Sequence, residues 1–340
     1  MPRVTSVTGA RATGADQPTF RQGTPLGHLV PEDLWRPVRI TLMVAYGLAY
    51  AWWLRVEGLP LDRISVTISV ALFLGCAFIG RPRHVWRLLA IDCLLYAAMW
   101  YAYERTRGAA DALGFPLQVE AMRDVDRFLF LGNDPTVVLQ ERFWHDTVRW
   151  WDVVASLTYH THFVLPVVAI AILWVASHRQ WVRFMKRFAT LLLVACAMFV
   201  VLPTAPPWMV SQKYELMAAL HRDPGRGVVH IGFKGFVHSY NVALGNGNPV
   251  AAMPSLHASF ALIVPAFFLP WIKPKWLKAL VLAFPVVMLA SLVYLGEHWA
   301  IDGLVGWAIV GASFWFWNRM ERRSRRQKAA RARVALAGLV

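Results

Sequence analysis

Two short motifs carry residue types and spacings that could do chemistry. His298 stands four residues before Asp302, which places both side chains on one face of a helix. An aspartate there holds one ring nitrogen and leaves the other electron-rich, as a histidine that attacks phosphorus requires. His257 stands in the second motif, just after Pro254 and Ser255. Together the motifs predict phosphoryl transfer through a phosphohistidine.

The residues before His257 predict the start of a helix. Pro254 suits a first helical position, and the Ser255 hydroxyl lies near it. Such a start exposes unpaired N–H groups, which favour a bound phosphate, and His257 in the first turn could reach the leaving oxygen. The alternative is that both motifs have a structural role. Pro254 and Ser255 would then only start a helix, His257 would lie at the membrane interface, and His298 and Asp302 would form an interfacial pair.

The composition predicts a membrane protein. The 340 residues are 57% hydrophobic and only 16% charged, and they include 17 Trp. The formal net charge is +15, but the basic residues fall in short blocks between long apolar segments. Such blocks suit anionic headgroups, so we expect no nucleic-acid partner.

The apolar segments predict an all-α membrane protein with about eight transmembrane helices, since one span needs about 20 apolar residues. The segments are Ile40–Leu54, Ile64–Gly80, Val85–Tyr103, Val153–Ala176, Phe188–Leu202, Ser255–Ile272, Leu277–Leu295 and Ala300–Trp317. The last six form the predicted catalytic core.

The basic blocks predict the orientation of these spans. Three connections and the tail after Asn318 are rich in Arg and Lys, so the positive-inside rule places them and both termini in the cytoplasm. The connections Arg105–Asp152 and Pro203–Pro254, and the turn that carries His298, then lie outside. The active site is therefore expected on the extracytoplasmic face.

This orientation divides the chain into four regions. We expect a flexible cytoplasmic tail over residues 1–34, two N-terminal transmembrane helices over 35–84, the six-helix core over 85–318 and a basic cytoplasmic tail over 319–340. The first long outer connection mixes charged and aromatic residues, which predicts interfacial helices.

At these motifs the chain resembles the type-2 phosphatidic acid phosphatase superfamily, whose second motif is PSGH and whose third is SRxxxxxHxxxD. The matching stretches are Pro254–His257 and Ser291–Asp302. The resemblance implies a six-helix phosphatase-like core, His257 as proton donor, His298 as nucleophile and Asp302 as its orienting partner. Two departures stand out, because Leu292 replaces the family's phosphate-binding arginine and the first motif, KxxxxxxRP, is not visible.

Other stretches resemble the inositol phosphorylceramide synthase branch, which comprises inositolphosphotransferases and bacterial relatives. They are Pro203–Trp208, Asp126–Thr136 and Tyr159–His162, and the resemblance spans about Val119 to Trp307. It implies an integral protein of a bacterial plasma membrane.

The missing arginine leaves the phosphate-binding residues open. His160 and His162 point in different directions on a helix; the YxxH pattern selects His162, with a structural core histidine as the alternative. Ser255 is expected to contact the phosphate. The basic candidates, which the sequence does not rank, are Arg127, Lys213, Arg222, Arg226 and Lys234.

The favoured function is transfer of a phospholipid headgroup phosphate, as phosphoinositol, to a lipid hydroxyl, without metal or other cofactor. The expected partners are the phospholipid donor, a lipid-alcohol acceptor and the membrane, while the oligomeric state is not predicted. If water replaces the alcohol, the enzyme is a lipid phosphate or polyprenyl-phosphate phosphatase. A zinc site built from His162, His257, His298 and Asp302 is a third possibility. A transporter is a fourth, supported only by Asp92 within a span.

Overall fold

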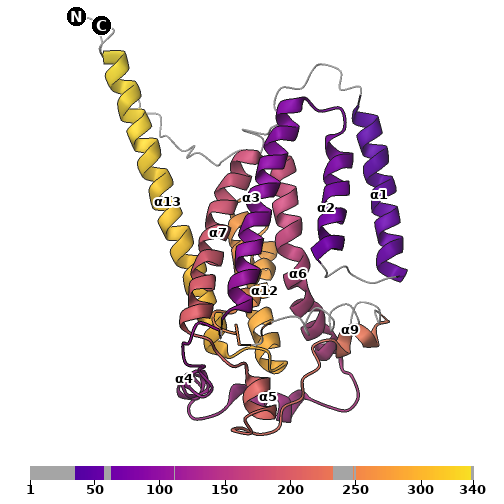
Figure 1. The fold of residues 1–340 in the computed structure, drawn as a ribbon, viewed down its shortest axis with the longest axis vertical. Coiled ribbons are helices and arrows are strands. Elements are labelled where there is room, and N and C mark those ends of the chain that lie inside the picture. Colours follow the sequence, from indigo (N-terminus) through magenta and orange to yellow (C-terminus); the bar gives the residue numbers. More distant parts are fainter. Residues whose placement is uncertain (1–34, 57–62, 111, 233–247, 249, 338–340) are drawn as a thin grey trace, which may run out of the picture.

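The protein is helical throughout the part that the structure describes. The computed structural model describes residues 35–56, 63–110, 112–232, 248 and 250–337, and the predicted tail over 1–34 lies outside these ranges. The described residues form helices and two isolated bridges, with no β-strand (Figure 1). The predicted all-α class is confirmed.

The helices follow the chain in three groups. The first group is α1 (Arg36–Val56), α2 (Arg63–Phe78), α3 (Arg83–Gly108), α4 (Ala121–Leu129) and α5 (Pro135–Phe143). The second is α6 (Trp150–Ala176), α7 (His178–Val201), α8 (Pro207–Gln212) and α9 (Arg226–His230). The third is α11 (Leu256–Phe268), the 3-10 turn η1 (Leu269–Trp271), α12 (Lys275–Tyr294) and α13 (Ala300–Ala337).

Each of the eight predicted apolar segments coincides with a helix, namely α1, α2, α3, α6, α7, α11, α12 and α13. Five of these, α3, α6, α7, α12 and α13 as far as Arg331, are long and apolar enough to cross a membrane. The stretches Ile68–Phe78 and Leu256–Trp271 are apolar but shorter, and α1 does not reach the same hydropathy. These helices make the chain an integral membrane protein.

Helix α11 lies at the centre of the bundle. It packs against α6, α7, α12 and α13, and most of its side chains are buried. Its sequence is apolar around the whole circumference, as expected of a helix enclosed by others. Helix α11 is therefore enclosed by these four helices.

Two helices of this bundle meet through main-chain atoms. Gly306 of α13 faces the first turn of α11, where a Cβ atom would lie 2.8 Å from the Ser255 carbonyl oxygen and would also meet the Ser259 hydroxyl. The Ser255 N–H donates to the Asp302 carbonyl oxygen at 3.0 Å. Glycine is required here because any side chain would force the helices apart.

The first long connection folds into α4 and α5, which lie with α9 at one end of the bundle, opposite the C-terminal end of α13 (Figure 1). Phe128 and Leu131 are 82% and 92% exposed there. Helices were predicted in this connection. Their contact with the membrane interface remains a prediction.

Asp92, expected to face protein, does so. Its carboxylate is buried and accepts hydrogen bonds at 2.8 Å from the Trp174 indole and from the His178 ring. The side chain ties α3 to the junction of α6 and α7, which is a structural role.

Candidate active site

His257 lies in the first turn of α11, as the second helical residue. Ser255 caps this helix, and its hydroxyl oxygen accepts the Ala258 N–H at 3.3 Å. The prediction that Pro254 takes the first helical position was wrong, because Ser255 provides the cap and Pro254 precedes it. The consequence is the same, since His257 projects from a helix start.

Aromatic rings from α6 stack on His257. The His162 ring lies 3.8 Å from the His257 ring between centroids, with 21° between their planes, and the Tyr159 ring lies 4.6 Å away. Phe260 stacks on His162 at 4.9 Å. This packing holds His257 in one orientation.

Buried nitrogen atoms in this stack lack hydrogen-bond partners. His257 Nε2 and His162 Nδ1 are both shielded from solvent and unsatisfied among the described residues, although the His162 ring is hydrogen-bonded to the Leu256 backbone. Buried polar atoms are normally paired, and exceptions gather at functional sites. The unsatisfied nitrogens mark a place where a polar ligand could bind.

His298 and Asp302 pair as their spacing predicted. His298 Nδ1 lies 3.3 Å from Asp302 Oδ2, which also accepts the Trp299 N–H at 3.0 Å. His298 is not on the helix, however, because α13 begins at Ala300 and His298 lies in the turn before it. The carboxylate is fully buried, so it fixes the ring and leaves Nε2 available for chemistry.

The two histidine motifs meet at one place. The ring centroids of His257 and His298 are 5.5 Å apart, with 57° between the planes. Hydrogen-bond contacts are about 3 Å long, so a single group placed between the rings could contact both. The structure thus brings together His162, His257, His298 and Asp302.

The segment Pro203–Trp208 holds the turn that carries His298. The Trp299 indole donates to the Ala205 carbonyl oxygen at 2.8 Å, and the Trp208 N–H donates to the Gly296 oxygen at 3.0 Å. Thr204 in turn bridges to Gln118 and Ala251 on either side. These hydrogen bonds therefore fix the position of the turn that carries His298.

Asp126 of α4 holds the same turn from another direction. Its carboxylate is fully buried and accepts the N–H groups of Ala300 and Ile301 at 2.7 and 2.9 Å, which caps the start of α13. Burial raises the pKa of Asp126 to about 6, against the opposing effect of these two hydrogen bonds. Asp126 thus orients the helix start beside Asp302.

Several predicted phosphate-binding residues lie elsewhere or have other partners. Ser255 is fully buried and serves as the cap. Arg127 is exposed and donates to the Gly132 carbonyl oxygen at 3.2 Å. Lys213 is exposed and lies 5.6 Å from the Tyr214 ring centroid. Lys234 lies outside the described residues.

The other two basic candidates each contact an aromatic ring and a carboxylate. Arg222 lies 3.8 Å from the Trp208 ring centroid and donates to Glu297 at 2.8 Å. Arg226 lies 4.0 Å from the Trp144 ring centroid and 3.6 Å from the Asp152 carboxylate. Both guanidinium groups already have anionic partners.

Two residues that hold the site had no role assigned from the sequence: Asp126 and Tyr159. Both lie in stretches that resemble the branch, Asp126–Thr136 and Tyr159–His162. The YxxH pattern was the available signal for Tyr159, whereas no local pattern shows what Asp126 caps.

Within the described ranges, no group of three or more His, Cys, Asp or Glu residues has an arrangement suited to a metal ion.

The chain is similar to known proteins over more than half of its length. The profile of the PAP2 superfamily matches residues 120–316, from the start of α4 into α13. A phosphoinositol dihydroceramide synthase from Bacteroides thetaiotaomicron is 26% identical over 274 residues, which cover 75% of this chain and 85% of that protein. No solved structure matches the chain.

The profile match covers more than half of the 340 residues and includes both histidine motifs. The resemblance predicted from those motifs is confirmed, and the relative is consistent with the predicted branch. The protein is thus a membrane enzyme of the lipid phosphatase or transferase kind, and the chain belongs to the PAP2 superfamily.

Proposed function

We propose that this enzyme transfers phosphoinositol from a phospholipid to a lipid hydroxyl through a phosphohistidine on His298. The observation that carries the proposal is the meeting of His257 and His298 rings 5.5 Å apart, with His298 held by a buried Asp302. The name of the 26% identical relative supports phosphoinositol as the group and a dihydroceramide-like hydroxyl as the acceptor.

In the first step, the Nε2 lone pair of His298 attacks the phosphorus of phosphatidylinositol. A P–N bond forms and the bond from phosphorus to the diacylglycerol oxygen breaks. Protonated His257 gives its proton to that oxygen, which releases diacylglycerol. The anionic phosphodiester favours the protonated form of His257, and Asp302 stabilises the positive charge that develops on His298.

The second step reverses these roles. Neutral His257 removes the proton from the acceptor hydroxyl as its oxygen attacks phosphorus. The P–N bond breaks, His298 is regenerated, and His257 again carries the proton. One P–O ester is exchanged for another, so no oxidant, reductant or nucleotide is consumed.

The choice between alcohol and water depends on access to this intermediate. His298 is only 8% exposed and Asp302 is fully buried, so the site contacts little bulk solvent. A phosphohistidine shielded from water lasts long enough to meet a lipid alcohol. The arrangement therefore favours transfer over hydrolysis.

The test is an assay of purified protein in detergent or vesicles with phosphatidylinositol labelled in the headgroup. Adding a dihydroceramide should yield a labelled lipid product together with diacylglycerol. Release of labelled inositol phosphate in equal amounts with and without the alcohol would show a hydrolase instead. Turnover of phosphatidic acid but not phosphatidylinositol would refute the proposed headgroup.

We further propose that the active site faces the extracytoplasmic side, with both termini in the cytoplasm. The basic extension of α13 lies at the opposite end of the bundle from α4, α5 and α9 (Figure 1). The positive-inside rule assigns that extension to the cytoplasm.

Cysteine labelling in intact cells tests this orientation. Cys76, Cys93 and Cys196 are first replaced by serine, and single cysteines are then placed at the exposed positions Phe128 and Lys328. A membrane-impermeant thiol reagent should label F128C in intact cells and K328C only after permeabilisation. The reverse pattern would invert the topology.

A further inference from the structure

The turn that carries His298 is held on the C-terminal side of this residue. Residues 295–299 lie between α12 and α13 and belong to neither helix, so contacts from other elements fix the direction of the His298 ring. The Trp299 N–H donates to the Asp302 carboxylate at 3.0 Å, and the Trp299 indole donates to the Ala205 carbonyl oxygen at 2.8 Å. The residue that follows His298 is therefore fixed.

On the N-terminal side of His298, the adjacent residue Glu297 forms an ion pair with Arg222. Arg222 Nε donates to Glu297 Oε1 at 2.8 Å, and a second guanidinium nitrogen lies 3.4 Å from Oε2. The same guanidinium lies 3.8 Å from the Trp208 ring centroid, and the Trp208 N–H donates to the Gly296 carbonyl oxygen at 3.0 Å. The two residues that precede His298 are therefore held as well.

The segment that carries Arg222 is itself tied to this turn by the Gln140 carboxamide. Gln140 Oε1 accepts the His221 N–H at 2.8 Å, and Gln140 Nε2 donates to the His221 carbonyl oxygen at 2.9 Å. Nε2 also donates at 2.8 Å to the carbonyl oxygen of Tyr294, the last residue of α12. Arg222 thus reaches Glu297 from a backbone that is already in place.

The two partners of the ion pair differ in exposure. The Glu297 side chain is 8% exposed and the Arg222 side chain is 26% exposed. A buried carboxylate is costly unless an opposite charge lies beside it, whereas a guanidinium that still contacts water is solvated without its partner. Loss of Arg222 would leave an unpaired carboxylate one residue before His298. Glu297 would then turn toward solvent and move the backbone that it shares with His298.

We propose that Arg222 is a positioning residue for the nucleophile, because its pairing with Glu297 fixes the peptide that leads into His298. This inference rests on the proposed function, since it takes His298 as the group that attacks phosphorus. Arg222 was among the basic candidates for phosphate binding, and the ion pair gives it a different role. A misplacement of about 1 Å near the reacting atoms can cost about 100-fold in rate, so the pair has a large effect without contacting the substrate.

The experiment compares R222Q, E297Q and the double substitution R222Q/E297Q in the full chain. The single-turnover rate of diacylglycerol release and the half-saturating lipid concentration are measured with phosphatidylinositol and with phosphatidic acid. R222Q should lower the rate about 10- to 100-fold, with little change in the half-saturating concentration. E297Q should lower the rate less, because the remaining guanidinium contacts water. The double substitution should be faster than R222Q, because no unpaired carboxylate remains.

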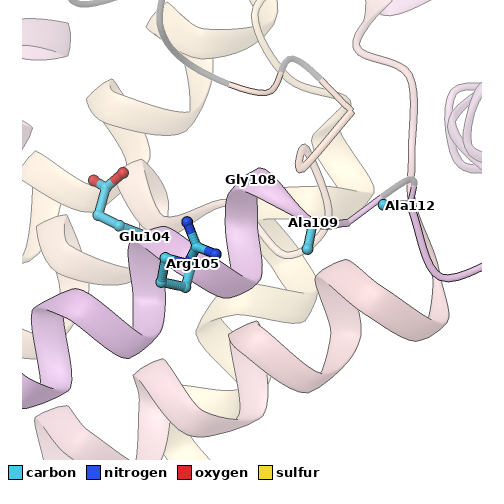
Figure 2. Close-up of a pocket in the computed structure, with 5 residues that line it drawn as sticks. All are labelled: Glu104, Arg105, Gly108, Ala109 and Ala112. Carbon is cyan, nitrogen blue, oxygen red and sulfur yellow. The ribbon is translucent and has the colours of Figure 1, made fainter.

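Two single substitutions serve as controls. R183Q breaks the ion pair of Arg183 with Glu321, which is 2.7 Å long, has a 24% exposed arginine and lies toward the other end of the bundle (Figure 1). R105Q removes a positive charge at the end of α3 that leads to α4. Arg105 is exposed there and lines a cavity of about 330 Å³ with Glu104, Gly108, Ala109 and Ala112 (Figure 2). Both controls should keep the single-turnover rate of the unmodified enzyme.

Three results would overturn the positioning role. A raised half-saturating concentration at an unchanged rate in R222Q would mean that Arg222 binds the phosphate directly. A double substitution as slow as R222Q would show that the unpaired Glu297 is not the cause of the loss. A lowered melting temperature in R222Q, with an unchanged rate well below that temperature, would leave a purely structural ion pair. If the unmodified enzyme turns over only phosphatidic acid, the proposed headgroup fails, and the rates with that lipid decide the role of Arg222.

Discussion

Replacing His298 with alanine is expected to lower kcat by about 10⁴-fold or more, because the covalent intermediate can no longer form. His298 lies in a turn, is 8% exposed and contributes to no helix, so its removal should leave the melting temperature nearly unchanged. The measurement is headgroup transfer from labelled phosphatidylinositol. It is combined with detection of acid-labile, base-stable phosphate on the protein.

Two further variants sharpen this experiment. D302N keeps an oxygen that can accept the Trp299 N–H but loses the charge that stabilises the His298 ring, so it should also be severely impaired. H145A removes an exposed histidine that lies away from the His257–His298 pair and should behave like the unmodified enzyme. Retention of the covalent label in H298A would show that another residue is the nucleophile.

Substitution of His257 by glutamine is expected to lower kcat on the lipid substrate by about 10²- to 10⁴-fold, the usual contribution of a general acid. The diacylglycerol alkoxide is a poor leaving group and needs a proton. Nitrophenolate leaves a nitrophenyl phosphodiester readily without one, so the first step with that substrate should be much less affected. The diagnostic measurement is the ratio of the two single-turnover rates of leaving-group release, because the second step needs His257 for both substrates.

The control for His257 is its neighbour in the stack. His162 donates no proton in the proposed mechanism. H162Q removes the ring whose centroid lies 3.8 Å from that of His257. It should slow both substrates by a similar factor, because it acts through positioning. If H257Q also slows both substrates equally, then His257 is a positioning residue and the proton comes from elsewhere.

Much of the fold was predictable because lipid restricts the chain to helices. Segments such as Val153–Ala176 and Leu277–Leu295 are apolar over a length that matches one span, and helices lie at both. The extension of α3 to Gly108 was not predicted, because charged residues after Tyr103 resemble a loop.

The site was predictable where its residues lie within one motif. The spacing of His298 and Asp302 predicted their contact, even though His298 precedes the helix rather than lying on it. Asp126 could not be predicted in this way, since it caps backbone groups 174 residues further along the chain. Contacts of that kind depend on tertiary packing, and a single sequence has no local signal for them.

The main-chain contact between α11 and α13 aligns the two histidines, and this alignment does not depend on the side chains that select the lipid. Ser255 and Asp302 are joined through backbone atoms, and Gly306 leaves no side chain between the helices. The separation of the two reactive histidines is thus set by peptide groups, which most substitutions do not alter. Exposed side chains of α4 such as Phe128 can therefore be exchanged to suit another lipid without shifting the two histidines, whereas Asp126 cannot.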